Sequence, residues 1–426
     1  MLMQDFIQFL TKSPVSFFAV RALRRKFVDA GFTELSLTDP NWQVAAGGRY
    51  YLTVGDSACF AFVLPEDLSK IKAPVYRMIG AHTDQPCLRV KPSPDMRQNG
   101  YYKLNIEVYG GPIFSTWLDR PLSLAGRVTL KSDDVFEPEV RYVDLKKPVL
   151  VIPNLAIHMN HDVNKGVALD PQTDLLPVGG LAEGQDATLL MDALCAALDV
   201  KAEDILDFDL FTYTTEPPCV VGFKDEFLSA PHLDDLVMVH TAATALMAAK
   251  PQTGVNIFCG FDHEEVGSRS RMGAGSETLY ILLEKLSKAL GRPHLTEDLM
   301  ESFMISGDVA HATHPNHPER HDPVLTTYLG KGPVIKIAAG QSYVTQSADY
   351  AVYEQICRKA GVPVQKFTNR SNARGGSTIG PIIAGRIPCR IVDMGVPILA
   401  MHSARELMAV QDHAYTRKSF VTFYNE

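Results

Sequence analysis

The alternation of helical and strand patterns after Val221 is the feature that most constrains the fold of this chain. The helical and strand-like segments follow one another in the order 233–249, 255–260, 278–290 and 334–338. The two strand-like segments are short and nearly continuous apolar runs, which is typical of strands buried on both faces of a parallel sheet. The sequence therefore predicts an α/β fold with a mixed, mostly parallel sheet flanked by helices.

The segment from residue 91 to residue 221 has a different pattern. Short strand-like runs separated by Gly and Pro occupy most of it, and one helical stretch at 186–198 interrupts them. This pattern is typical of an inserted all-β domain. We therefore predict one α/β domain formed by 1–90 and 222–426, and a β-rich second domain formed by 91–221.

Composition excludes several functional classes. The 426 residues include 41 Lys and Arg against 49 Asp and Glu, so a net charge of −8 argues against a nucleic-acid partner. No run of 18 apolar residues predicts a membrane span, and the N-terminus lacks the pattern of a signal peptide. Seven cysteines without a Cys-x-x-Cys pair indicate reduced thiols, so we expect a cytoplasmic protein without a membrane partner.

Two adjacent carboxylates, Glu264 and Glu265, follow the apolar run at 255–260. Open α/β sheets build their sites beyond the carboxyl ends of strands, and adjacent residues there point in different directions. One carboxylate could bind a metal ion while the other acts as a base toward a water molecule. A solvated turn is an equally good interpretation of this feature alone.

Four further clusters of His, Asp and Glu lie at strand ends or element junctions. Each has a structural alternative, such as a structural histidine at 82 or simple helix capping at 234. Together they favour a metal site, because zinc binds imidazole and carboxylate and a metal pair needs one bridging carboxylate. Asp84 could orient the imidazole of the first cluster. The residues that supply the ligands are His82, Asp234, Glu265, Asp308 and His402.

The sequence resembles the aspartyl aminopeptidases, which are dinuclear metallopeptidases with a zinc exopeptidase-like catalytic domain and a dodecameric shell. The similarity covers nearly the whole chain. The motifs that carry it include Gly80-Ala81-His82-Thr83-Asp84, Ile152-Pro153-Asn154-Leu155-Ala156-Ile157-His158, Asp262 to Ser268, His314-Pro315-Asn316, Lys331-Gly332-Pro333-Val334-Ile335-Lys336 and Met401-His402-Ser403. Two departures stand out: Phe18 occupies a position where relatives can carry His, and His232-Leu233-Asp234-Asp235 replaces Arg-Leu-Asp-Asn.

The resemblance implies a role for each site residue. Asp234 would bridge two metal ions, with His82 and Asp308 on one ion and Glu265 and His402 on the other. Glu264 would be the general base, and Asp84 would orient His82. Lys336 and Tyr343 would contact the acidic side chain of the substrate. His158, in the inserted domain, would reach the active site of a neighbouring subunit and polarise the scissile carbonyl. The insert would then also be the oligomerisation domain.

We therefore expect a cytoplasmic, homododecameric aminopeptidase that releases N-terminal Asp or Glu from peptides by attack of a metal-bridging hydroxide. Two divalent ions per chain are expected, and zinc is favoured, although manganese and cobalt suit the same ligands. One alternative is a broad-specificity aminopeptidase or amidase with the same dinuclear core. Another is a catalytically silent shell or scaffold protein, against which the intact Glu264 argues.

Overall fold

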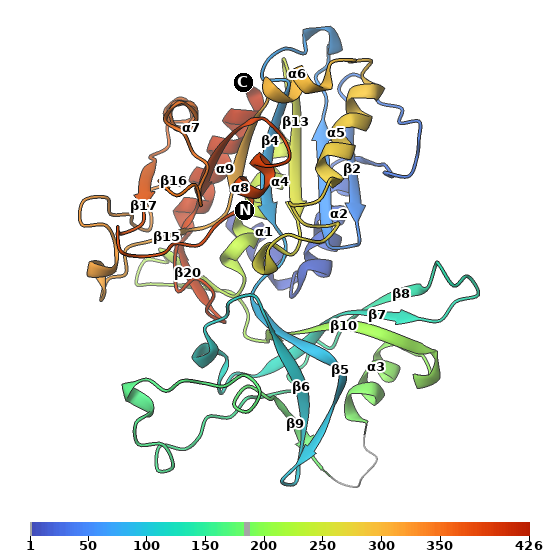
Figure 1. The fold of residues 1–426 in the computed structure, drawn as a ribbon, viewed down its shortest axis with the longest axis vertical. Coiled ribbons are helices and arrows are strands. Elements are labelled where there is room, and N and C mark those ends of the chain that lie inside the picture. Colours follow the sequence, from blue (N-terminus) through green and yellow to red (C-terminus); the bar gives the residue numbers. More distant parts are fainter. Residues whose placement is uncertain (1, 183–187) are drawn as a thin grey trace. The chain divides into compact units, whose positions relative to one another are not determined.

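The computed structural model describes residues 2–182 and 188–426 and divides the chain into two compact units (Figure 1). Unit 1 comprises Met1–Asp84, Pro218–Met401 and Glu406–Glu426, and unit 2 comprises Gln85–Pro217 and His402–Arg405. Both units are held together by their own hydrophobic cores.

A nine-stranded mixed sheet forms the centre of unit 1. Its four middle strands, β13, β4, β14 and β18, run parallel to one another, and antiparallel pairings appear on both sides of them. The strands in spatial order are β1 (Thr33–Glu34), β2 (Arg49–Val54), β3 (Ala58–Val63), β13 (Val255–Phe261), β4 (Tyr76–His82), β14 (Phe303–Gly307), β18 (Arg390–Gly395), β16 (Val334–Ile337) and β17 (Gln365–Thr368). This confirms the predicted mixed, mostly parallel sheet.

Helices cover both faces of this sheet (Figure 1). One face packs against α1 (Leu2–Thr11), α2 (Ser16–Asp29), α4 (Leu233–Ala248), α7 (Ser347–Ala360) and α9 (Val410–Asn425). The other face packs against α5 (Thr278–Ala289), α6 (Leu295–Met300) and α8 (Ile379–Ala384). Successive residues of a strand point to opposite faces, so Cys59 and Ala61 of β3 enter the first core and Phe60 and Phe62 enter the second.

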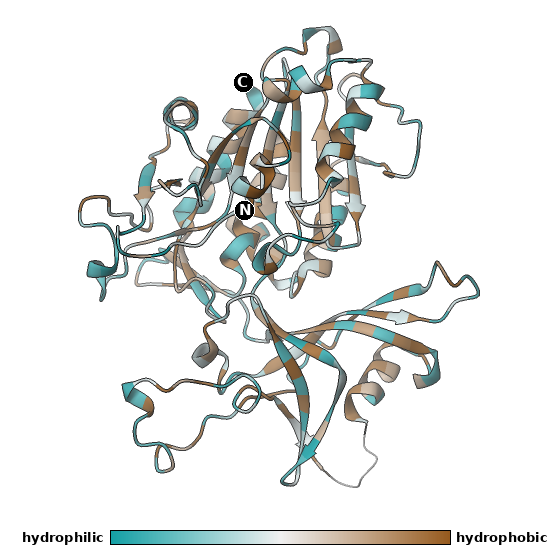
Figure 2. Ribbon diagram, viewed as in Figure 1, coloured by the Kyte–Doolittle hydropathy of each residue, from teal (hydrophilic) through white to brown (hydrophobic). Residues whose placement is uncertain are grey.

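Burial on both faces explains the continuous apolar runs in the sequence, since every side chain of β13 is buried. Figure 2 shows hydrophobic residues along the central strands of unit 1. A smaller sheet in the same unit has the order β11 (Cys219–Val221), β12 (Phe227–Ala230), β20 (Glu406–Ala409), β19 (Pro397–Leu399) and β15 (Ala310–His311).

Unit 2 is built on a six-stranded sheet in which all strand pairs are antiparallel. Hydrophobic and hydrophilic residues alternate along its strands (Figure 2), as expected for a sheet with one face in a core. Its strands in spatial order are β8 (Glu139–Asp144), β7 (Leu122–Leu130), β10 (Ile205–Thr214), β5 (Cys87–Gln98), β6 (Tyr101–Tyr109) and β9 (Val178–Leu181). Helix α3 (Leu189–Leu198) matches the predicted helical stretch at 186–198, of which residues 186 and 187 lie outside the described residues.

Candidate metal centre

Three neighbouring parallel strands of unit 1 end at the same edge of the sheet and bring chemistry-bearing residues there. His82 is the last residue of β4, and Asp308 follows β14 directly. Glu264 and Glu265 begin a short 3₁₀ helix, Glu264–Val266, just after β13. The structure thus gathers three of the predicted clusters, because the carboxyl ends of parallel strands meet at one edge.

The fourth predicted cluster, which contains Asp234 and Asp235, lies on the first turn of α4. Asp234 and Asp235 are 3% and 0% exposed, and their backbone angles lie outside the helical region. The backbone N–H of Asp234 donates to Oε2 of Glu406 at 3.0 Å. The backbone N–H of His82 donates to Oδ2 of Asp235 at 3.1 Å, which ties the end of β4 to the start of α4.

These elements create a compact group of potential metal ligands. His82, Asp234, Asp235 and Asp308 are all buried, and each offers one ligand atom within 4.8 Å of the others. A second group of the same kind contains His82, Glu264 and Glu265. Within the first group, Nε2 of His82 lies 3.2 Å from Oδ1 of Asp234.

Asp84 links the histidine to the loop that carries the glutamates. Nδ1 of His82 lies 3.0 Å from the backbone oxygen of Asp84 and 3.4 Å from its Oδ1. The carboxylate of Asp84 also accepts the backbone N–H groups of Glu264, at 3.1 Å, and Glu265, at 3.2 Å. Asp84 is therefore placed to orient both the imidazole and the two glutamates.

The potential metal ligands include several acidic side chains that lie close together in the protein interior. Burial raises the pKa of Asp235 and of Asp308. Burial, together with the neighbouring carboxylates of Asp308 and Asp84, raises the pKa of Glu264 to about 7. Oδ1 of Asp235 is buried and accepts no hydrogen bond within residues 2–182 and 188–426. Crowded, buried carboxylates with an unused acceptor beside an imidazole fit a divalent cation, which supplies the missing positive charge.

Lys336 and Tyr343 lie next to this group and are both 3% exposed. Nζ of Lys336 is 3.7 Å from Oδ2 of Asp308 and donates to the backbone oxygen of Val309 at 3.0 Å. The same ammonium lies 5.2 Å from the centre of the Tyr343 ring. The structure therefore brings both predicted substrate-binding residues into unit 1 beside Asp308.

Two other predicted site residues belong to unit 2. His402 adopts a positive φ of 66°, and its Nδ1 lies 3.0 Å from the backbone oxygen of Gly111. His158 is exposed and sits in a turn of the inserted segment. Their roles as a metal ligand and as a donated catalytic group stay predictions.

No role for Asp235 or Glu406 was predictable from the sequence. Asp235 was visible as the second acid of the 232–235 cluster, but pattern alone could not show that both acids turn inward. Glu406 is 2% exposed and lies at the start of β20, distant in sequence from α4, so no local signal pointed to it.

The chain is similar in sequence to a family of known peptidases. A family model described as Aminopeptidase I zinc metalloprotease (M18) matches residues 9–424. A probable M18 family aminopeptidase 2 from Clostridium acetobutylicum is 46% identical over 424 residues, covering 98% of this chain and 97% of the relative. A protein of the same description from Pseudomonas aeruginosa is 41% identical over 433 residues, covering 99% and 98%.

Solved structures of aminopeptidases have the same fold as this chain. A chain from the cryo-EM structure of the Ape4 and Nbr1 complex superposes with a TM-score of 0.94 at 33% identity, covering 99% of this chain and 85% of that one. The structure of the S. cerevisiae mApe1 dodecamer gives a TM-score of 0.85 at 26% identity, covering 99% and 96%.

Among the described residues, no helix combines the length and the apolar character needed to cross a bilayer.

Proposed function

The chain belongs to the M18 family of zinc metalloproteases and is a metallo-aminopeptidase, and from this premise we propose that it releases N-terminal Asp and Glu residues from peptides. The observation that carries the proposal is the buried ammonium of Lys336, 3.7 Å from a carboxylate of the candidate metal centre. A lysine has three donor hydrogens, and the contacts with Val309 and Asp308 leave capacity for a substrate carboxylate. Tyr343 flanks the same ammonium.

We propose that two divalent ions occupy the centre, and the description of the family as zinc metalloproteases favours zinc. Asp234 would contact both ions, with His82 and Asp308 holding one ion and Glu265 and His402 holding the other. The buried, mutually close ligand atoms of His82, Asp234 and Asp308 support the first half of this assignment. Ions held there would supply a Lewis acid and lower the pKa of a water molecule used in hydrolysis.

The proton chemistry is assigned to Glu264. Its carboxylate begins the loop next to the ligand group, and burial raises its pKa to about 7, near the operating pH that suits a general base. Asp84 would hold that loop in place beside His82, because its carboxylate accepts the backbone N–H groups of both glutamates and also faces the imidazole. In this scheme Glu264 takes the proton from water and passes it to the leaving amine.

We further propose a homododecamer in which segment 91–221 is the oligomerisation domain and 1–90 with 222–426 is the catalytic domain. The mApe1 relative is a dodecamer. His158 lies in an exposed turn beside Ile157 and Met159, which are 49% and 74% exposed, so this apolar turn suits a contact with a second subunit. His158 would then complete a neighbouring active site. The seven cysteines include no Cys-x-x-Cys pair, and this usage favours a cytoplasmic location.

Metal analysis combined with a substrate panel tests the proposal. The purified protein is stripped with a chelator, reloaded with zinc, manganese or cobalt, and assayed on Asp-, Glu-, Leu- and Lys-arylamides. We expect about two ions per chain at full activity and a clear preference for Asp and Glu. Equal kcat/KM for Leu- and Asp-arylamides would contradict acidic specificity, and full activity with one ion per chain would contradict the dinuclear centre.

A further inference from the structure

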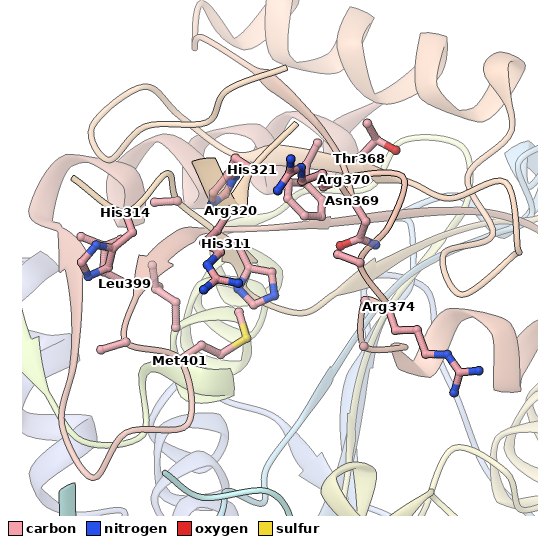
Figure 3. A pocket seen from close by; sticks show the side chains of 17 residues that line it. His311, His314, Arg320, His321, Thr368, Asn369, Arg370, Arg374, Leu399 and Met401 are labelled. Atoms are coloured by element: carbon pink, nitrogen blue, oxygen red, sulfur yellow. The ribbon is translucent and has the colours of Figure 1, made fainter. Parts of the chain in front are cut away.

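A cavity of about 330 Å³ in unit 1 is lined by an unusual set of side chains (Figure 3). No Asp or Glu occurs among the described residues that line it, although the chain as a whole carries a net charge of −8. Its titratable lining is instead basic and comprises His311, His314, Arg320, His321, Arg370 and Arg374. Such a concentration of one sign of charge in a concave surface attracts an anion.

One of the three arginines of this basic cavity has a carboxylate partner among the described residues, and the other two have none. Within residues 2–182 and 188–426, no carboxylate pairs with Arg370 or Arg374, and Arg320 lies 3.7 Å from its sequence neighbour Glu319. Burial lowers the pKa of His321, so the permanent positive charge of the cavity comes from the arginines. Figure 3 shows the labelled side chains of Arg320, Arg370 and His321 near one another among the residues that line the cavity.

The basic cavity lies next to the proposed catalytic centre. Phe367 lines it, and the ring of Phe367 lies 5.9 Å from that of His311 and 6.4 Å from that of Tyr343. Tyr343 in turn lies 5.2 Å from Nζ of Lys336, which is 3.7 Å from Asp308. The cavity is therefore separated from the carboxylate group by the Lys336–Tyr343 pair.

We propose that the basic cavity binds a second carboxylate of the substrate, on an acidic residue downstream of the scissile bond. The proposal rests on the proposed function, because Lys336 is already assigned the acidic side chain of the N-terminal residue. A peptide extends by about 3.3–3.6 Å per residue, so a residue beyond the first can reach past Tyr343 toward the cavity. The preferred substrates are accordingly peptides with at least two acidic residues near the N-terminus.

Matched tetrapeptide amides test this assignment. The native enzyme is assayed on Asp-Ala-Ala-Ala-amide and on the three peptides in which one Ala is replaced by Glu. We expect one Glu-containing peptide to be cleaved with a kcat/KM about five-fold above the all-Ala peptide, as an exposed ion pair of about 1 kcal/mol provides. Arg370→Gln and Arg374→Gln should each reduce that ratio, and added salt should reduce it further in the native enzyme.

Arg25→Gln is the control, because it removes the same charge from an arginine on α2 whose side chain is 78% exposed and pairs with Asp29. Ratios near one for all three Glu-containing peptides, or equal ratios in Arg370→Gln and Arg25→Gln, would overturn the proposal. A cavity that takes only free small anions would give the same flat ratios. The peptide series is repeated with Leu at the N-terminus, so that a downstream preference is measurable even if the preference for an N-terminal acid proves wrong.

Discussion

Replacing Lys336 with Met isolates the proposed recognition of an acidic N-terminal residue. Burial lowers the pKa of this lysine, but the surrounding acidic groups, with Asp308 foremost among them, together outweigh burial and raise the pKa above its ordinary value. The ammonium is therefore charged at neutral pH, 3.7 Å from Asp308 and 3.0 Å from the backbone oxygen of Val309. Methionine keeps most of the apolar stem and removes only the charge and its donors.

The expected magnitude follows from the charge and burial of this group. A hydrogen bond to a charged partner contributes about 1.5–3 kcal/mol, which corresponds to a factor of about 10 to 150 in kcat/KM. The substitution also removes a cation beside Asp308, and that loss affects every substrate equally. The informative quantity is therefore the ratio of kcat/KM for Asp-arylamide to that for Leu-arylamide, which should fall by about 10- to 150-fold.

Lys366→Met is a matched control on the neighbouring strand β17. Residue 366 pairs with Ile335 in the sheet, is exposed, and places its Nζ 4.1 Å from the centre of the Tyr350 ring, much as Lys336 faces Tyr343. This variant should leave the Asp-to-Leu ratio unchanged. If Lys336→Met lowers both activities by the same factor while thermal unfolding shows an intact fold, acidic recognition belongs to another residue.

Four other perturbations address the remaining assignments. Glu264→Gln should lower turnover by about 10²- to 10⁴-fold with unchanged metal content; more than a tenth of native activity would refute its role as base. Asp234→Ala should lose both ions, so two ions per chain by elemental analysis would contradict a bridging ligand. Asp412 is buried and accepts N–H groups from Gly330 and Gly332, and burial raises its pKa to about 7. The folded chain then holds a proton that the unfolded chain releases near pH 4, so this group stabilises the fold below pH 4 and its contribution is lost as pH rises toward 7. Asp412→Asn should flatten that decline in urea unfolding at pH 5 and 8, and an unchanged slope would exclude Asp412 as its source. Co-expressed His158→Ala and Glu264→Gln chains should regain activity at about a quarter of sites if His158 acts in a partner subunit; confirmed co-assembly without activity would place His158 elsewhere.

The sequence predicted the central sheet well because that sheet is buried on both faces. The apolar runs at 255–260 and 334–338 are confirmed as β13 and β16, and the helical pattern at 233–249 is confirmed as α4. The spatial order of strands was not predictable in this way. Strand β13 pairs with β3 and β4, whose residues lie nearly two hundred positions earlier, and only long-range packing selects those partners.

The candidate site was predictable as a set of clusters, and less so as a set of individual atoms. Strand ends were readable from the apolar runs, so the sequence indicated His82, Asp308 and the Glu264–Glu265 pair. No role was predicted for Asp235, because adjacent residues of a regular helix point about 100° apart. Two neighbouring acids that both face the interior are therefore not expected in a helix. The backbone at Asp234 and Asp235 is not helical, so both side chains can face the interior. No pattern in the sequence predicts this local departure from helical geometry.

The resemblance described above leads us to expect Arg-Leu-Asp-Asn where this chain has His232-Leu233-Asp234-Asp235, and this difference changes the charge around the centre. Burial lowers the pKa of His232 to about 4, so a neutral imidazole stands in place of a cation, while Asp235 puts a carboxyl group in place of an amide. The first change removes a positive charge from a half-buried position, and the second adds an acidic group at a fully buried one. Charge compensation must then come from divalent ions and from Lys336, the ammonium beside Asp308. The lysine that we assign to substrate recognition therefore also helps to stabilise the ligand group, which is why its removal should affect all substrates as well as their ratio.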